Sequence, residues 1–227
     1  MLVRPNRTHS RKIKIVIGNH EVDSQELTED YMNYFGLREQ FYSFNYKNMH
    51  FLALSTETDY DQDSEQYAFA ERDLAKYSKD PSTDWIIVFY HQHVYGSGPE
   101  EEETDFRETY HPLFDKYKVD LALQGHNHVY ERTHPITFNA DDDDAPLVQD
   151  YHPNIYKNPN GPIFITVGTG GANDMTISSL EDFSAKGIGG KFGILDIALE
   201  NDQKTLTGTF IENGKKKQIM DDFKIIK

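Results

Sequence analysis

Three apolar segments of this sequence each run directly into a polar loop that carries histidine. They are "KIKIVIGNHE", "DWIIVFYHQH" and "VDLALQGHNHVYER", at residues 12–21, 84–93 and 119–132. We expect each to form a buried strand, because short apolar runs that end at Gly or polar residues are typical of strands. Helix-like segments lie between them, so the order of elements predicts a layered α/β fold. In such folds, binding sites gather at the carboxyl ends of the strands.

The remaining segments complete the predicted architecture. Residues 41–56 alternate around "KN" and predict a hairpin. Residues 64–79 predict an amphipathic helix with Ser64 as its N-cap. A second helix is expected over residues 104–118, broken or kinked at Pro112. Four later segments, separated by Gly or Asn-Gly turns, predict strands of a second sheet packed on the first: 161–171, 191–200, 204–214 and 217–227.

Net charge restricts the partners that the chain can have. It contains 38 Asp and Glu residues against 23 Lys and Arg, a formal net charge of −15. Such a surface repels polyanions, so we expect no nucleic-acid partner and no anionic membrane. No apolar run approaches the roughly 20 residues that cross a bilayer, and the basic start of the sequence lacks a signal-peptide pattern. The absence of Cys excludes thiolate metal sites and cysteine nucleophiles.

Two acidic runs, "EEEE" at 100–103 and "DDDD" at 141–144, interrupt the pattern of strands and helices. A calcium loop needs spaced acidic and carbonyl ligands together with a Gly, and neither run has that spacing. Blocks of like charge repel one another and remain mobile. We therefore expect both runs to be solvated loops.

Histidine is the residue type that most strongly indicates a site. Four of the ten histidines and one asparagine fall at the ends of the three predicted strands: Asn19, His20, His91, His126 and His128. Neutral imidazole is the commonest metal ligand and suits ions such as zinc and iron. A single histidine at such a place is more often structural. Several in a row at one edge of one sheet favour a metal site.

The order of these motifs resembles a known family. "GNHE", an apolar strand ending in His91 and then "GHNHVYER" are similar to the ordered motifs of the calcineurin-like metallophosphoesterases. "YKVDLALQGHNHVYER" followed by "GPIFITVGTGG" resembles the purple acid phosphatase branch in particular. The resemblance implies a partial four-layer α/β/β/α sandwich, with two mixed sheets flanked by helices. It also implies that residues 1–227 are the C-terminal portion of a single metallophosphoesterase catalytic domain.

The resemblance also implies roles for individual residues. Asn19, His91 and His126 are similar to the ligands of the family's second metal. His128 resembles the imidazole ligand of the first. His20 resembles the histidine that contacts the substrate phosphate and protonates the leaving alkoxide.

Five neighbouring residues are expected to support these groups. Glu21 could orient the imidazole that precedes it, because a catalytic imidazole usually needs an acceptor on its other nitrogen. For His93, two roles remain open: contact with the substrate, or a place on the surface or behind the ligands. Tyr130, Glu131 and Arg132 are expected to pack behind the loop of residues 125–128, called the metal-ligand loop, and to support it.

Two family motifs are absent from these 227 residues. The family pattern begins with D-x-G and G-D-x-x-Y, which supply a metal-binding Asp, a bridging Asp and a Tyr. The sequence contains neither D-x-G nor a G-D dipeptide. We therefore expect at most one well-held ion, at Asn19, His91 and His126, where the intact family binds two. The resemblance indicates Fe together with Zn, Mn or Fe.

The function implied by the resemblance is a metal-dependent phosphoric ester hydrolase of acid phosphatase type. In this reaction a metal-bound hydroxide would attack a small phosphomonoester. The alternative is an inactive fragment, or a non-enzymatic module that binds metal or a partner. Two explanations of the missing motifs stay open: a chain that is part of a longer phosphatase, and a short protein that has lost activity. Family members are often exported, but the compartment stays unassigned.

Overall fold

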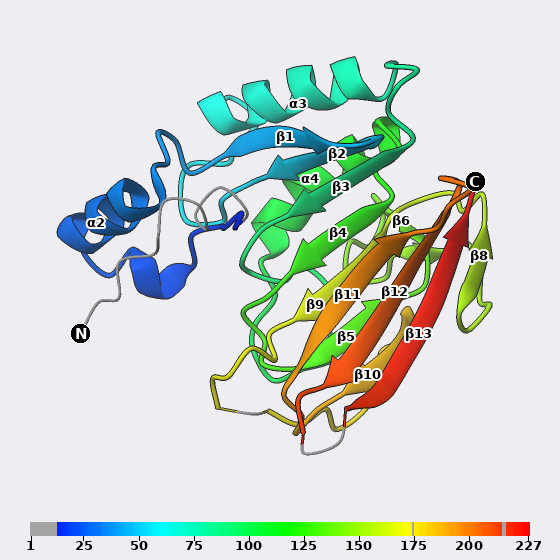
Figure 1. Cartoon of the computed structure of the whole chain (residues 1–227). Helices are drawn as coiled ribbons and strands as arrows, with labels where there is room; N and C mark the ends of the chain where they lie inside the picture. The colour runs from blue at the N-terminus through cyan, green and yellow to red at the C-terminus, as the bar shows by residue number, and fades with distance from the viewer. Residues whose placement is uncertain (1–12, 174, 215–216) are drawn as a thin grey trace.

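The structure is a computed structural model that describes residues 13–173, 175–214 and 217–227. Its centre is a seven-stranded mixed sheet (Figure 1). In spatial order the strands are β1 (Tyr42–Tyr46), β2 (Met49–Ala53), β3 (Trp85–Phe89), β4 (Leu121–Gln124), β9 (Ile163–Val167), β5 (Tyr130–Thr133) and β10 (Ser184–Ile188). Strands β2, β3, β4 and β9 run parallel to one another. The loops that follow these four strands therefore leave the same edge of the sheet.

Helices cover one face of this sheet and a second sheet covers the other (Figure 1). The helices are α3 (Glu65–Tyr77) and α4 (Thr104–Lys116). The second sheet has the order β11 (Gly193–Leu199), β12 (Thr205–Glu212), β13 (Gln218–Ile226) and β8 (Ile155–Lys157). A small hairpin-like pair consists of β6 (Ile136–Thr137) and β7 (Leu147–Val148). The predicted α/β fold class and the second sheet packed on the first are confirmed.

The continuous apolar run of β3 follows from burial on both sides. Ile86 and Val88 pack in the cluster that contains the helices, while Trp85 and Ile87 pack in the cluster shared with the second sheet. Successive side chains of a strand point to opposite faces, so a strand covered on both faces needs apolar residues at every position. Such a strand lies in the middle of the molecule and holds its terminal loop in a fixed place.

Most of the predicted elements are present. The hairpin around "KN" is formed by β1 and β2, with Lys47 in the left-handed region at φ 56°. Ser64 caps α3 by accepting a hydrogen bond from the backbone N–H of Tyr67 at 3.0 Å. Helix α4 runs through Pro112, so the break expected there is wrong. The carbonyl that loses its partner belongs to Glu108, an exposed residue where water can replace the missing donor.

The first predicted strand is not a strand. Residues 13–18 have no regular secondary structure, although Ile17 is fully buried. A strand requires a neighbouring strand to pair its backbone groups. Here the N–H and the carbonyl of Ile15 both bond to the hydroxyl of Tyr42, at 2.9 and 2.6 Å. The apolar pattern therefore indicated the burial of Ile17, but the backbone groups of Ile15 bond to a side chain where a strand would bond to a neighbouring strand.

One helix was not predicted. Helix α2 (Gln25–Phe35) begins after Ser24, whose side chain accepts from the N–H of Leu27, and ends at Gly36 with φ 71°. None of its residues is buried, but Leu27, Tyr31 and Phe35 recur at the i, i+4, i+8 spacing of an amphipathic helix. The signals that could have located it are the serine at its start and the glycine just after its end.

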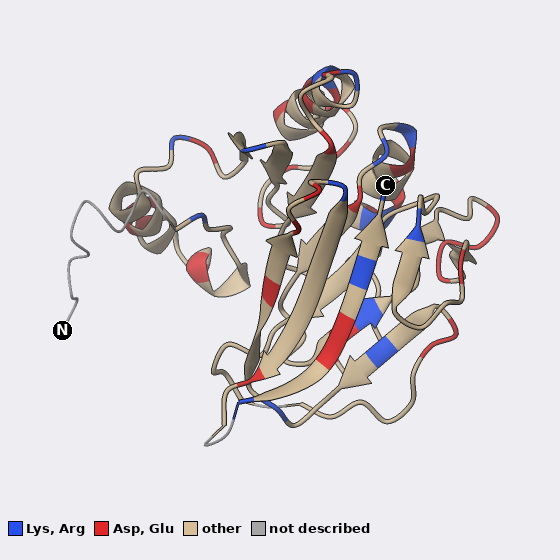
Figure 2. Ribbon diagram, turned by 45° about the vertical axis from the view of Figure 1, so that its right-hand side comes forward, with Lys and Arg blue, Asp and Glu red and all other residues tan. Residues whose placement is uncertain are grey.

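The acidic runs are not simply solvated loops. Glu102 from the first run and Asp143 and Asp144 from the second all pair with the buried guanidinium of Arg107. These three side chains contact α4, because a buried cation needs anionic partners, although Asp144 keeps 77% of its side chain exposed. Figure 2 shows that the other acidic residues are spread over several elements. Among the described helices, none is long and apolar enough to cross a membrane.

Candidate metal centre

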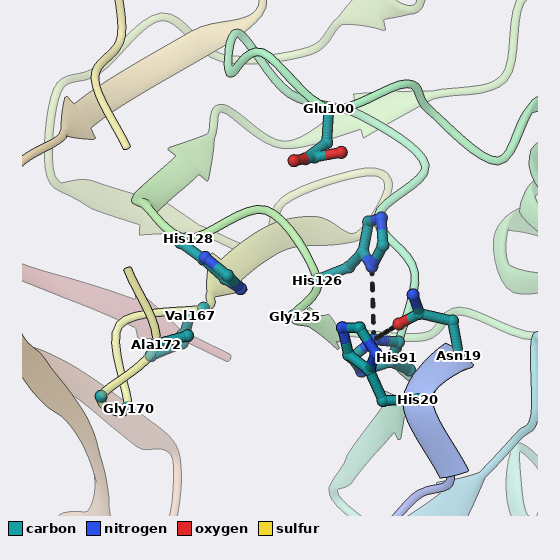
Figure 3. A pocket seen from close by; sticks show the side chains of 12 residues that line it. Asn19, His20, His91, Glu100, Gly125, His126, His128, Val167, Gly170 and Ala172 are labelled. Atoms are coloured by element: carbon teal, nitrogen blue, oxygen red, sulfur yellow. Dashed lines mark hydrogen bonds between the residues drawn. The ribbon is translucent and has the colours of Figure 1, made fainter. Parts of the chain in front are cut away.

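The histidine-bearing loops converge on one cavity of about 590 Å³. The loops after β3, β4 and β9 form its walls, and a short 3-10 turn, η1 (Asn19–Glu21), closes one side. All five residues singled out at the predicted strand ends line it: Asn19, His20, His91, His126 and His128 (Figure 3). Segments more than 100 residues apart in sequence therefore meet at one edge of the sheet, as expected for loops after parallel strands.

Three of these side chains approach one another closely. His91 Nε2 lies 2.9 Å from Asn19 Oδ1 and 3.3 Å from His126 Nδ1 (Figure 3). Ligand atoms at about 2.0–2.1 Å from a tetrahedral zinc ion are about 3.3 Å apart. The two distances from His91 Nε2 are close to this spacing. The donor set fits one metal.

Glycines allow His91 to sit against the backbone of the neighbouring loops. A Cβ on Gly18 would lie 2.7 Å from the His91 ring, and the N–H of Gly125 donates to the carbonyl of His91 at 2.8 Å. His126, the residue after Gly125, has φ 60° in the left-handed region. This tight turn aims the side chain of His126 at His91.

Electrostatics keep the central imidazole neutral. Burial lowers the pKa of His91 to about 4, and the nearby ring of His126 contributes in the same direction. A histidine that is neutral at pH 7 has a free lone pair on one ring nitrogen. It therefore meets the first requirement of a metal ligand without having to release a proton.

His128 stands apart from this trio across the cavity (Figure 3). Its Nδ1 lies 2.7 Å from the carbonyl oxygen of Asn173. A carbonyl can only accept, so Nδ1 carries the proton and Nε2 keeps its lone pair. Metal-binding histidines commonly hold their second ring nitrogen in this way. His128 has the tautomer of a ligand. It lies apart from Asn19, His91 and His126, which are called the Asn19 group below.

The turn that carries His20 is fixed by the residue after it. His20 is exposed and lines the cavity beside His91 (Figure 3). The carboxylate of Glu21 accepts from the backbone N–H of Gly18 at 3.0 Å. This contact closes the turn from its own start, and it places Glu21 as a support for the backbone of Asn19 and His20.

His93 lies beneath the loop, outside the cavity wall. It is fully buried, and its ring stacks on His126 with a centroid distance of 6.0 Å. Burial lowers its pKa to about 4, again with a contribution from His126. Its Nε2 lies 3.5 Å from the amide nitrogen of Asn127, which is also fully buried. The structure therefore puts His93 behind the candidate ligand His126, in the second of the two places expected for it.

The three residues after the metal-ligand loop tie it to the rest of the molecule. Tyr130 stacks on Phe210 of the second sheet at 4.2 Å between ring centroids. The carboxylate of Glu131 accepts from the N–H and the hydroxyl of Ser97, at 2.7 and 2.5 Å. Arg132 pairs with Asp221 at 2.8 Å. All three are buried, in agreement with the packing role expected of them.

Sequence reasoning missed the carboxylate of the cavity wall. Glu100 lines the cavity and faces it from the loop after β3 (Figure 3). Glu100 belongs to an acidic run that was expected to be solvated. Four consecutive glutamates give no local signal of which one faces a cavity. Among the described residues, no group of three or more His, Cys, Asp or Glu is arranged to hold a metal ion. Candidate coordination therefore depends on the amide of Asn19 together with two imidazoles.

Comparison with known proteins agrees with the geometry. Residues 2–130, more than half of the 227-residue chain, match the calcineurin-like phosphoesterase family. The chain belongs to the calcineurin-like phosphoesterase family. Membership supports phosphoester hydrolysis as the chemistry of the family and implies divalent or trivalent metal ions.

Several proteins similar to this chain are purple acid phosphatases. Purple acid phosphatase 15 of Arabidopsis thaliana is 28% identical over 191 residues, covering 78% of this chain and 33% of that protein. Probable inactive purple acid phosphatase 27 of the same plant is 35% identical over 147 residues, covering 62% and 23%.

A solved structure shows the same likeness. The purple acid phosphatase PPD1 from yellow lupin (Lupinus luteus) matches with a TM-score of 0.71 and 31% identity, over 82% of this chain and 32% of that one. The chain spans about a third, or less, of the length of these relatives.

Proposed function

We propose that this cavity is the site of a metal-dependent phosphoric ester hydrolase of acid phosphatase type, acting on a phosphomonoester. The single observation that carries the proposal is the convergence of Asn19, His91 and His126, with ligand atoms 2.9 and 3.3 Å apart. Family membership supports the reaction class. The choice of iron together with zinc, manganese or a second iron rests on the resemblance of the sequence motifs to those of purple acid phosphatases.

The protein's own residues divide the task between the walls of the cavity. Asn19, His91 and His126 would hold one ion, and His128 would offer a lone pair from the opposite wall. A metal ion bound there would act as a Lewis acid on a phosphoryl oxygen. It would also lower the pKa of a bound water toward neutrality. The glycine-rich loop after β9, with Gly168 and Gly170 in the wall, leaves room for a phosphate group.

Proton donation to the leaving oxygen is the role proposed for His20. It is exposed at the edge of the cavity beside His91, where it can exchange protons with water. A positioned imidazole that protonates the leaving oxygen contributes about 10²–10⁴-fold to a hydrolysis rate. We assign this role to His20, with Glu21 fixing the turn that presents it.

A second candidate function is a non-enzymatic metal-binding module. The observation in its favour is that the closely spaced candidate ligands are Asn19, His91 and His126, enough for one ion, while His128 lies across the cavity against the carbonyl of Asn173. One relative is itself named a probable inactive phosphatase. Such a module would bind an ion at the Asn19 group and release no phosphate from an ester.

Hydrolysis of an aryl phosphate by the purified chain separates the two candidates. Each of zinc, manganese and iron is added, and the rate is measured with and without a chelator. His20→Asn is compared with His152→Asn, because His152 is exposed and lies outside the cavity. Chelator-sensitive turnover that falls at least about 100-fold in His20→Asn alone supports the enzyme. Absent or chelator-insensitive turnover contradicts it.

A further inference from the structure

The loop after β3 is anchored at several points near the candidate metal centre. The N–H of Glu103 donates to the carbonyl of His93 at 2.9 Å and closes the base of the loop. The N–H of Gly96 donates to Glu102 at 2.7 Å, and Ser97 donates to Glu131. These contacts come from three directions. They fix the backbone that carries the intervening residues over the cavity.

The four consecutive glutamates of this loop have different surroundings. Glu102 pairs with the buried Arg107, and Glu103 accepts from the hydroxyl of Tyr60 at 2.7 Å. Glu101 is exposed. Glu100 is the member whose carboxylate faces the cavity, from the side opposite His91 (Figure 3). The run thus delivers one carboxylate to the cavity and uses two others to hold the loop.

Glu100 gives the cavity an unusual charge for one that would hold a phosphate ester. None of the described lining residues is Lys or Arg, and Glu100 is the one carboxylate among them. A phosphate held near His91 and His126 would leave its alcohol portion to extend across the cavity. An anionic alcohol portion would be repelled by Glu100, and a cationic one would be attracted, because the partly enclosed space screens charges less than bulk water.

We propose that Glu100 makes this cavity select phosphate monoesters whose alcohol portion carries a positive charge, as an amino alcohol does. The inference rests on the proposed function, since the phosphate end is placed at the histidines. The wall formed by the end of β9 and the loop after it consists of small uncharged residues, including Val167, Gly170 and Ala172. That wall contributes no charge, so the preference depends on Glu100.

A matched pair of phosphonates tests the selection without any turnover. 2-Aminoethylphosphonate and propylphosphonate have the same length and differ in the terminal charge, and their carbon–phosphorus bond is not an ester. Their affinities for the zinc-loaded chain are measured by calorimetry. We expect the amino compound to bind more tightly, by up to about 5-fold, the upper end of the range for a partly exposed ion pair. The preference should shrink as salt is added.

Two glutamine variants locate the effect. Glu100→Gln should bring the ratio of the two affinities to about one, while Glu101→Gln keeps the wild-type ratio. Equal affinities in the wild-type chain, failure to bind either phosphonate, or a ratio unchanged by Glu100→Gln would overturn the inference. Zinc lost from Glu100→Gln would also overturn it, because Glu100 would then be a metal ligand. Failure of the proposed function is seen separately, as absent ester hydrolysis with the phosphonate preference intact.

Discussion

At the scale of single residues, the metal-ligand loop depends on glycines that touch Asn127. A Cβ on Gly98 would fall 1.9 Å from the amide nitrogen of Asn127, and one on Gly168 would fall 2.0 Å from its carbonyl oxygen. Asn127 lies between His126 and His128 in sequence and is fully buried. The orientation of both histidines therefore depends on how closely two other loops can approach this residue.

Gly168→Ala should displace the loop. The new methyl group meets backbone atoms that cannot rotate away, and overpacking of this kind costs about 1–3 kcal/mol of the free energy of unfolding. Chemical denaturation measures the loss. Gly170→Ala is the matched control, because no atom lies within 4 Å of a Cβ there, and its effect should stay within about 0.5 kcal/mol. Equal stability of the two variants would contradict the packing argument.

At the scale of elements, prediction from sequence succeeded where burial and pairing agree. The hairpin of β1 and β2, the helix α3 and the strand β3 show their period in the sequence because one or both faces are buried. It failed at residues 13–18, where Ile17 is buried but the backbone has no strand partner, and at α2, where no residue is buried. Pairing and long-range contact are not encoded in the local period.

Helix α4 shows how one buried cation organises elements that the sequence does not connect. Arg107 donates to the carbonyl of Val94. It also pairs with Glu102, which precedes the helix in the sequence, and with Asp143, which follows the helix by more than 20 residues. Arg107→Met should lower the free energy of unfolding by about 1–3 kcal/mol, because it leaves the partly buried carboxylates of Glu102 and Asp143 without their partner. The matched control is Arg72→Met, since Arg72 is exposed on α3. A similar small loss in both variants would refute this assignment.

The loss in Arg107→Met should also depend on pH. Burial raises the pKa of Glu102, and Arg107 acts against that rise. Without Arg107, the pKa in the folded state moves further above the unfolded value of about 4.3. Above that value the folded protein then binds more protons than the unfolded one, so its stability falls as the pH rises. Denaturation at pH 4 and pH 7 should show the larger loss at pH 7.

At the scale of the whole molecule, the two sheets are joined by a polar contact inside an apolar interface. Arg132 of β5 pairs with Asp221 of β13, and the hydroxyl of Tyr130 donates to the same carboxylate at 2.8 Å. Both partners of the ion pair are nearly excluded from solvent. The contact begins four residues after His126 and two after His128, so it links the metal-ligand loop to the packing of the second sheet.

Asp221→Ala should therefore destabilise the molecule strongly. It leaves the buried guanidinium of Arg132 without its carboxylate, which typically costs about 3–5 kcal/mol. Asp222→Ala is the control, because Asp222 is the adjacent residue and is exposed. Thermal and chemical unfolding of the two variants measure the difference. A loss in Asp222→Ala as large as that in Asp221→Ala would show that the pairing contributes little.

Prediction of the site followed the same logic on a larger scale. Parallel strands place their terminal loops at one edge, and this rule accounts for the meeting of His91 and His126. Asn19 reaches them from a turn that follows no strand, and its role and the separate role of His128 were predicted from the resemblance of the motifs. The rule did not find Glu100, whose direction is set by the anchoring of its loop. Side-chain direction within a long loop depends on contacts with several other segments, and a single sequence does not show them.

The most direct test of this account is the binding of one ion by the Asn19 group. Zinc or cobalt is titrated into the full chain and into His91→Ala, His126→Ala and, as control, His152→Ala. We predict about one tightly held ion in the wild-type and control proteins. Each of the other two variants should lose more affinity than the roughly 10- to 100-fold that removal of an outer partner costs. Undiminished binding in His91→Ala and His126→Ala would contradict the central claim.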